Sequence, residues 1–217
     1  MEIKQINQPA SILNTFVSEM RDVNIQRDPL RFRHNLERMG NIFAYEISKT
    51  LTYEHQTITT PLGTAQELLP REKIVVTSIL RAGVPLHNGI ISFFDRAENG
   101  FVSAFRKYTD DGDFDIHIEY ISAPDLNGKT VIMADPMLAT GSSLELAYKA
   151  IKANGRPEHV HLVGIIASQA GVEYIRNMLD DEPVTLWLAA VDDELNAKSF
   201  IVPGLGDAGD LAYGPKL

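Results

Sequence analysis

The stretch that decides the fold runs from Val131 to Ser143 and reads VIMADPMLATGSS. It opens as a continuous apolar run, as in a buried strand, and closes on small and hydroxyl-bearing residues, as at the start of a helix. A loop between a strand and a helix offers backbone N–H donors and the positive end of the helix dipole to an anion. The stretch therefore predicts a phosphate-binding loop at the carboxyl end of a strand.

The same residues allow a plainer interpretation. Ser142 or Ser143 could cap the helix with its hydroxyl, and Asp135 could lie in an ordinary turn. In the binding interpretation, Asp135 follows the strand without an evident partner and is placed to bond paired ribose hydroxyls. Spacing alone leaves both interpretations open.

On either side of this loop, short β-rich runs alternate with helical segments, which predicts an α/β fold with a mainly parallel twisted sheet flanked by helices. We expect one domain over residues 1–217 with a helical N-terminal region over 1–50. In that region the apolar stripe that follows Asp28-Pro29 indicates core or a subunit interface. The other predicted helices span 84–94, 143–153 and 171–179, the predicted strands span 74–80, 130–134, 159–167 and 184–190, and strands 101–107 and 114–121 form a β-hairpin arm that turns at 110–113.

Composition excludes several classes of protein. The chain has 217 residues, no cysteine and a net charge of −9, from 20 Lys and Arg against 29 Asp and Glu. Without cysteine there is no disulfide, thiolate zinc site or cysteine nucleophile, and the acidic balance argues against a nucleic acid as the main partner. There is neither a signal-peptide core nor a run of about 20 apolar residues, so we expect a cytoplasmic protein without a membrane partner.

Two further motifs do not carry a function by themselves. Residues 204–209 read GLGDAG and satisfy the dinucleotide-binding pattern, but only eight residues follow, too few for the strand–turn–helix unit that this pattern needs. His159 and His161 could share one face of a strand as metal ligands, yet no third ligand is suggested nearby. We expect both to be partly exposed strand histidines.

The loop closely resembles the motif with which type I phosphoribosyltransferases bind phosphoribosyl diphosphate (PRPP), and it is most similar to that of the uracil phosphoribosyltransferases. Other blocks agree in content and order: LRAG at 80–83, Phe105-Arg106, and IVPGLGDAGD at 201–210. The resemblance covers most of the chain. It implies a type I phosphoribosyltransferase fold in which residues 195–217 form a C-terminal, uracil-binding hood.

The implied activity is pentosyl transfer: PRPP and uracil give UMP and diphosphate. The resemblance implies Mg²⁺ as a companion of PRPP, bound through the substrate rather than by a protein cage. It assigns uracil to Ile201, Gly206, Asp207 and Ala208. It assigns PRPP to Arg81, Arg106, Asp135, Pro136, Met137, Leu138, Ala139, Thr140, Gly141, Ser142, Ser143 and Asp207.

Within this set we expect Asp207, Arg106 and Asp135 to act in catalysis, and we hypothesise that Asp207 organises the PRPP end and receives the N1 proton of uracil. Ser142 stands where the family usually has a second glycine, so the backbone angle φ at this position decides whether serine is strained. The resemblance also implies a homodimer or tetramer and, as in some relatives, a GTP effector.

A rival interpretation keeps the same fold but makes the chain an RNA-binding regulator of a pyrimidine operon. The net charge of −9 and the complete block at 201–210 argue against it. RNA binding that weakens with salt, without release of diphosphate from PRPP and uracil, would favour the regulator.

Overall fold

The computed structural model describes the backbone of residues 1–108 and 114–215, and the side chains of those residues except 104–118. The predicted turn at 110–113 lies outside the described residues, and so does the side chain of Arg106. Among the helices in these ranges, none has the length and apolar character needed to cross a membrane.

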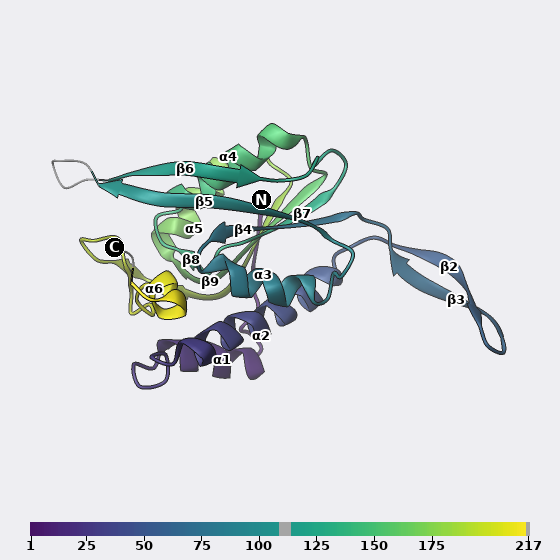
Figure 1. Ribbon diagram of the computed structural model, residues 1–217, viewed down its shortest axis with the longest axis horizontal. Coiled ribbons are helices and arrows are strands. Elements are labelled where there is room, and N and C mark those ends of the chain that lie inside the picture. The colour runs from purple at the N-terminus through teal and green to yellow at the C-terminus, as the bar shows by residue number, and fades with distance from the viewer. Residues whose placement is uncertain (109–113, 216–217) are drawn as a thin grey trace.

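An eight-stranded sheet forms the centre of the molecule, with strand order β1-β10-β9-β7-β4-β5-β6 and β8 paired to β9 (Figure 1). The pairing of β5 with β6 is antiparallel and the other pairings in this sheet are parallel. The predicted mainly parallel α/β fold is therefore confirmed. The strands are β1 (Glu2–Gln5), β4 (Ile74–Leu80), β5 (Glu98–Tyr108), β6 (Phe114–Ser122), β7 (Thr130–Ala134), β8 (Met137–Leu138), β9 (His159–Ser168) and β10 (Val184–Asp192).

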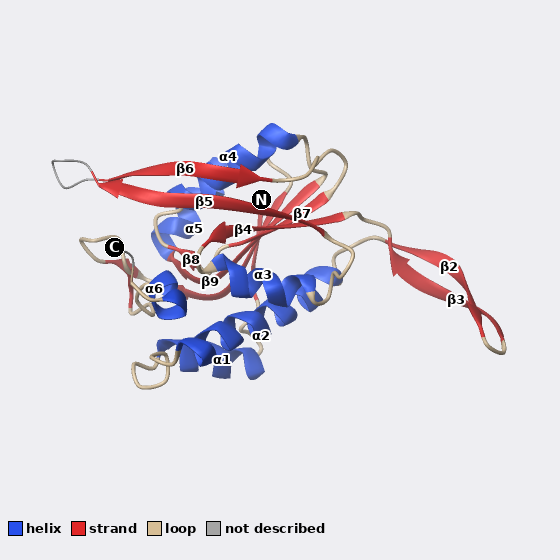
Figure 2. Ribbon diagram, in the orientation of Figure 1, coloured by secondary structure: helices blue, strands red, loops and turns tan. Residues whose placement is uncertain are grey.

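Helices cover both faces of the sheet (Figure 2). Successive strand residues point to opposite faces, so Val76 and Ile132 pack into one apolar cluster while Val75 and Val131 pack into the other. This double coverage explains why every residue of β7 is buried. The first cluster includes α1 (Ile12–Arg21), α2 (Pro29–Ser48), α3 (Gly83–Ile91) and α6 (Ala208–Tyr213), and the second includes α4 (Ser142–Ile151) and α5 (Gln169–Met178).

The predicted N-terminal helix is α2, and its stripe belongs to the core of this chain. The Asp28 carboxylate accepts the N–H groups of Leu30 and Arg31, and Pro29 occupies the first turn, as the sequence indicates. Five of the six residues of the stripe are at most 1% exposed, namely Phe32, Leu36, Met39, Phe43 and Ile47, whereas Leu30 at the start of the helix is 57% exposed. Of the two predicted roles, core or subunit interface, the core is therefore confirmed for these five residues.

Several elements were not predicted. Residues 2–5 form β1, an edge strand that pairs with β10, and 12–21 form α1. A two-stranded hairpin, β2 (Tyr53–Thr60) with β3 (Gly63–Pro70), projects away from the body (Figure 1). A short antiparallel pair, β11 (Glu194–Leu195) with β12 (Ile201–Val202), precedes α6. The segment from β12 to α6 lines the same cavity as the carboxyl end of β4 and the residues after β7.

Candidate active site

The loop after β7 opens directly onto the start of α4. The N-cap of α4 is Gly141, which has φ of +89° and makes no side-chain cap hydrogen bond. Ser142 and Ser143 lie inside the helix, so the capping interpretation of these serines is wrong. Ser142 has no positive φ, and its hydroxyl lies 3.2 Å from that of Thr140. The Ser142 N–H donates to the Thr140 hydroxyl at 3.4 Å, and the N–H groups that follow it in the first turn can receive an anion.

Residues at the start of α5 fix this loop by a hydrogen bond and by close packing. The buried Ser168 hydroxyl donates to the carbonyl of Ala139 at 2.6 Å and accepts the N–H of Gly171 at 2.9 Å. A Cβ at Gly171 would lie 2.3 Å from the Ala139 carbonyl oxygen, so only glycine permits this approach. Ser168 and Gly171 were not predicted, because their partner lies 29 residues away from Ser168 in the sequence.

Tyr174 of α5 closes the other side of the same loop. A Cβ at Gly141 would lie 2.7 Å from Cδ1 of Tyr174, so glycine is required here by contact as well as by φ. The Tyr174 hydroxyl donates to Glu145, which also pairs with Lys149 at 2.5 Å. The Lys149 ammonium and the Tyr174 hydroxyl lower the pKa of Glu145, so this carboxylate stays charged and links α4 to α5.

Asp135 follows β7 and faces the cavity. Burial raises the pKa of Asp135 to about 7, although the N–H of Met137 donates to its carboxylate at 3.3 Å and opposes the shift. No positively charged side chain contributes to this shift. A carboxyl group with an unmet need for donors, at the end of a strand, suits a ligand that brings hydroxyl groups or a cation.

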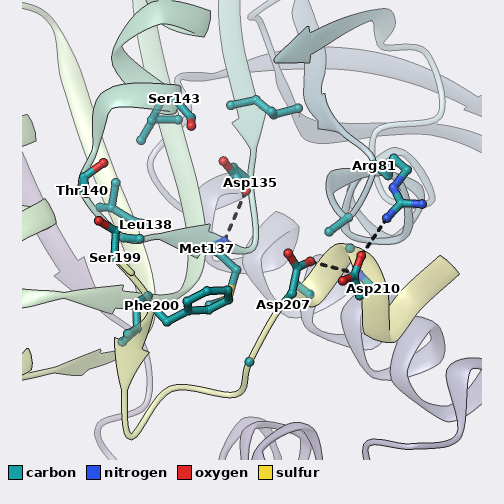
Figure 3. Close-up of a pocket in the computed structure, with 18 of the residues that line it drawn as sticks. Arg81, Asp135, Met137, Leu138, Thr140, Ser143, Ser199, Phe200, Asp207 and Asp210 are labelled. Atoms are coloured by element: carbon teal, nitrogen blue, oxygen red, sulfur yellow. Dashed lines mark hydrogen bonds and ion pairs between the residues drawn. The ribbon is translucent and has the colours of Figure 1, made fainter. Parts of the chain in front are cut away.

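Residues from three segments enclose one cavity of about 630 Å³ (Figure 3). The segment from the end of β7 to the first turn of α4 contributes Asp135, Met137, Leu138, Ala139, Thr140, Gly141, Ser143 and Leu144. The end of β4 and the turn after it contribute Ile79, Leu80, Arg81 and Ala82. The C-terminal segment contributes Ser199, Phe200, Ile201, Gly206, Asp207, Ala208, Gly209 and Asp210. The structure thus brings most of the predicted PRPP and uracil residues together.

Two predicted residues stand outside this lining, and the structure does not describe the side chain of a third. Pro136 is buried, and its carbonyl accepts the N–H groups of Ile165 and Ile166. Ser142 lies in the first turn of α4 and is not among the lining residues. The backbone of Arg106 belongs to β5, whereas its side chain lies outside the described residues. Conversely, Ser199 and Phe200 line the cavity and were not predicted, and Figure 3 shows Phe200 beside Met137.

Arg81 stands in the turn between β4 and α3, after a cis peptide bond from Leu80. Its Nη2 donates to Oδ1 of Asp210 at 3.1 Å and to the carbonyl of Gly214 at 3.1 Å. Gly83, two residues on, lets the turn approach β7, because a Cβ there would lie 2.8 Å from the Ala134 carbonyl oxygen. Packing of this turn against β7 therefore requires glycine at position 83.

The C-terminal loop is shaped by glycines and by a buried ion pair. Gly204 and Gly206 have φ of +56° and +97°, which other residues rarely adopt. Asp192, only 8% exposed, accepts the Gly204 N–H at 2.9 Å and binds the Arg21 guanidinium through both oxygens at 2.7 and 2.8 Å. Arg21 also donates to the carbonyl of Gly204 at 2.9 Å. This bracing set of Arg21 and Asp192 was not predicted, since 171 residues separate the pair.

Asp207 caps α6 and borders the cavity. Its Oδ1 accepts the N–H of Asp210 at 3.0 Å, which fixes the side chain, and Figure 3 shows the carboxylate between Asp135 and Asp210. Ile201 and Ala208 are buried on either side of the loop. The GLGDAG pattern thus leads into a helix of six residues, as part of this cavity and not of a dinucleotide-binding unit.

The histidine pair lies elsewhere, on β9. His161 is 4% exposed and accepts a hydrogen bond from Nε1 of Trp187 at 3.0 Å, so the expectation that it is partly exposed is wrong. Burial lowers the pKa of His161 to about 3. His159 lies 3.0 Å from the Thr185 hydroxyl. Within residues 1–108 and 114–215, no cluster of three His, Asp or Glu side chains is arranged to hold a metal ion.

Comparisons with known proteins agree with this geometry. The family model described as uracil phosphoribosyltransferase matches residues 8–215. A uracil phosphoribosyltransferase from Porphyromonas gingivalis is 57% identical over 217 residues, which cover 100% of both chains, and one from Methanothermobacter thermautotrophicus is 39% identical over 86% of this chain and 85% of its own.

Solved structures show the same fold. The AQ2163 protein from Aquifex aeolicus superposes with a TM-score of 0.87 at 31% identity and covers 99% of both chains. An adenine phosphoribosyltransferase from Trypanosoma brucei superposes with a TM-score of 0.55 at 12% identity, over 87% of this chain and 83% of that one, a likeness of fold alone. By sequence over its whole length and by the loops that form its cavity, the chain belongs to the uracil phosphoribosyltransferase family.

Proposed function

We propose that the chain transfers the phosphoribosyl group of PRPP to N1 of uracil, giving UMP and diphosphate. The observation that supports this most is the shared cavity, in which the loop before α4 and the loop before α6 face each other. The first offers uncapped N–H groups to a phosphate, and the second offers backbone groups to a flat base. Membership of the family supplies the substrates' identity.

In the proposed reaction, the bond between N1 and the anomeric carbon forms, the bond from that carbon to diphosphate breaks, and the N1 proton leaves. Positive charge builds on the ribose and negative charge on the leaving group, so the protein contributes alignment and charge stabilisation. Asp135 would hold the ribose hydroxyls, and the Ala139–Ser143 segment would hold the 5-phosphate. Arg81 and Arg106 would hold the diphosphate.

The base would be recognised through the backbone of Ile201, Gly206 and Ala208. Uracil presents a donor at N3 and an acceptor at O4, and cytosine presents the reverse pair. A fixed C=O and N–H cannot reorient, so cytosine would leave buried polar groups unpaired, which can reject an analogue by on the order of 10⁴-fold. The braced loop at Gly204 supports such rigidity.

Mg²⁺ is part of the proposal as a companion of PRPP. The cavity offers separate carboxylates, Asp135 and Asp207, rather than a cluster of ligands. That donor set fits a cation that keeps water and substrate oxygens as most of its ligands. When bound, Mg²⁺ would neutralise charge on the diphosphate. Asp207 would organise the PRPP end of the cavity and would receive the N1 proton that leaves uracil.

The test is UMP formation from PRPP, uracil and Mg²⁺ by the purified protein, followed by chromatography, with cytosine and hypoxanthine as competing acceptors. We expect UMP and no product from the competitors. Absence of UMP, together with RNA binding that weakens with salt, would replace the proposal with the regulator. Unchanged turnover in Asp207→Asn with both substrates would remove Asp207 from the mechanism. Adding GTP to the same assay tests whether GTP is an effector of this chain.

A homo-oligomer is also proposed, and the β2–β3 hairpin supports it. A two-stranded hairpin alone is marginally stable in water, and this one exposes apolar side chains, including Leu62 at 100% and Leu68 at 54%. Sedimentation of the wild type and of the double variant Leu62→Asp, Leu68→Asp tests the point. We expect the variant to dissociate; a monomeric wild type would contradict the proposal.

The cytoplasmic location is tested by cell fractionation.

A further inference from the structure

Arg81 connects two parts of the cavity that the sequence treats as separate. It belongs to the β4–α3 turn, which faces the expected diphosphate, yet both of its hydrogen bonds go to the C-terminal segment. Asp210 and Gly214, its partners, lie 129 and 133 residues further along the chain. Figure 3 shows the ion pair between Arg81 and Asp210 at the edge of the cavity.

Asp210 hydrogen-bonds to both ends of α6 and to Arg81. Its N–H donates to Oδ1 of Asp207 at 3.0 Å, its carbonyl accepts the N–H of Gly214 at 2.8 Å, and its carboxylate binds Arg81. The helix is short, so few bonds hold it. A displacement of Asp210 would therefore move Asp207 and Ala208, which border the proposed uracil site.

The Arg81 guanidinium has N–H donors that make no hydrogen bond to the described residues. Both bonds to the C-terminal segment use Nη2, while Nε is buried and has no hydrogen-bond partner among the described residues. A guanidinium has five N–H donors in a fixed fork, and two of them are on Nη1, so Nη1 can bind a phosphate group without loss of the bond to Asp210. One side chain can thus hold the diphosphate and α6 together.

We propose that Asp210 is a positioning residue that, through Arg81, couples occupancy of the diphosphate site to the shape of the uracil site. This inference rests on the proposed function. Diphosphate bound to Nη1 of Arg81 fixes the guanidinium, the guanidinium fixes Asp210, and α6 then holds Asp207 and Ala208 in place for the base. Uracil should therefore bind more tightly when the diphosphate site is filled, and this gain should depend on Asp210.

The experiment is a double-mutant cycle of Arg81→Ala and Asp210→Ala, read in KM for uracil, KM for PRPP and kcat. We expect each single variant to raise KM for uracil about 10-fold and the double variant to raise it no further, because both remove one coupling. We expect Asp210→Asn, which keeps an acceptor, to recover part of the loss. Only the variants without Arg81 should raise KM for PRPP strongly.

Arg33→Ala is the matched control. Arg33 of α2 donates to the carbonyl of Ala212 at 2.7 Å and lies over the Tyr213 ring, so it holds α6 through contacts that do not involve Asp210. In the double variant Arg33→Ala, Arg81→Ala, the two fold-increases in KM for uracil should multiply. This separates a specific coupling from a general loosening of the helix.

Binding gives a readout besides activity. Calorimetry of uracil with and without inorganic diphosphate and Mg²⁺ should show tighter binding with diphosphate in the wild type and no such gain in Asp210→Ala. The inference is overturned if the effects of Arg81→Ala and Asp210→Ala multiply, or if Asp210→Ala keeps the gain. If the wild type forms no UMP and binds no uracil, the proposed function fails instead.

Discussion

Replacing Gly171 with alanine should displace the predicted phosphate loop without replacing any residue that lines the cavity. The added Cβ would lie 2.3 Å from the Ala139 carbonyl oxygen and 2.9 Å from that of Leu138, where ordinary contact begins at 3.4 Å. Both clashes are with backbone, so the loop must move by about 1 Å. The move also strains the bond from Ser168 to Ala139.

Two magnitudes follow from this displacement. Overpacking of this kind costs about 1–3 kcal/mol in the free energy of unfolding. A misplacement of about 1 Å in the group that positions a substrate can cost about 10²-fold in rate. We therefore expect kcat/KM for PRPP to fall by about 10²-fold, with KM for uracil changed far less, because the base loop is braced separately by Asp192.

The assay is initial-rate kinetics with PRPP and uracil varied in turn, together with urea unfolding. Gly128→Ala is the control: Gly128 has φ of +66° and no atom within 4 Å of its added Cβ, so alanine there costs about 1–2 kcal/mol far from the cavity. If Gly171→Ala folds and keeps kcat/KM for PRPP within about threefold of the wild type, the position of the Ala139 carbonyl does not govern PRPP binding.

Three further changes follow from the same structure. Asp192→Ala removes the carboxylate that pairs with the Arg21 guanidinium and accepts the Gly204 N–H, so the free energy of unfolding should fall by about 2–4 kcal/mol and KM for uracil should rise. Urea unfolding and initial-rate kinetics measure the two effects, and an unchanged KM for uracil would show that Asp192 does not brace the loop. Because burial raises the pKa of Asp135 to about 7, the native state binds a proton that the unfolded state has lost, and this group lowers stability as pH rises from about 4 to about 7. Asp135→Asn should thus match the wild type below about pH 4 and exceed it by up to about 4 kcal/mol at about pH 8, while losing PRPP binding; thermal unfolding across this range tests the sign. Ser142→Gly should lower the melting temperature, because Ser142 lies in α4 without a positive φ and glycine costs up to about 1 kcal/mol there; a stabilised variant would show that serine is strained.

Local pattern predicted the parts of the site that depend on local geometry. A buried strand followed by small and hydroxyl residues indicates a loop with free N–H groups, and the structure has that loop between β7 and α4. The correction at Ser142 and Ser143 is also local: Gly141, with its positive φ, occupies the cap and leaves the serines inside the helix. Nothing in residue spacing distinguishes these arrangements, because both place a hydroxyl near the first turn.

The apolar stripe of α2 shows a different limit. Its spacing predicts one buried face, and that face is buried. Whether it packs on its own sheet or on a second subunit depends on what lies opposite, which periodicity does not report. The β2–β3 hairpin was missed for a related reason, since its strands are exposed over most of their length and have no apolar alternation of the kind that marks a half-buried strand.

By itself, the sequence determined the sheet-and-helix architecture and the loop between β7 and α4, because each arises from neighbouring residues whose backbone geometry their own side chains set. The loop at 201–210 was assigned to the base only through the family resemblance. Only the tertiary structure decided which distant groups hold those loops in place: Ser168 behind Ala139, Arg21 and Asp192 beneath Gly204, and Arg81 against Asp210. These pairs are brought together by the order of strands in the sheet. A charged or hydroxyl side chain looks the same in the sequence whether its partner is water or a residue more than a hundred positions away.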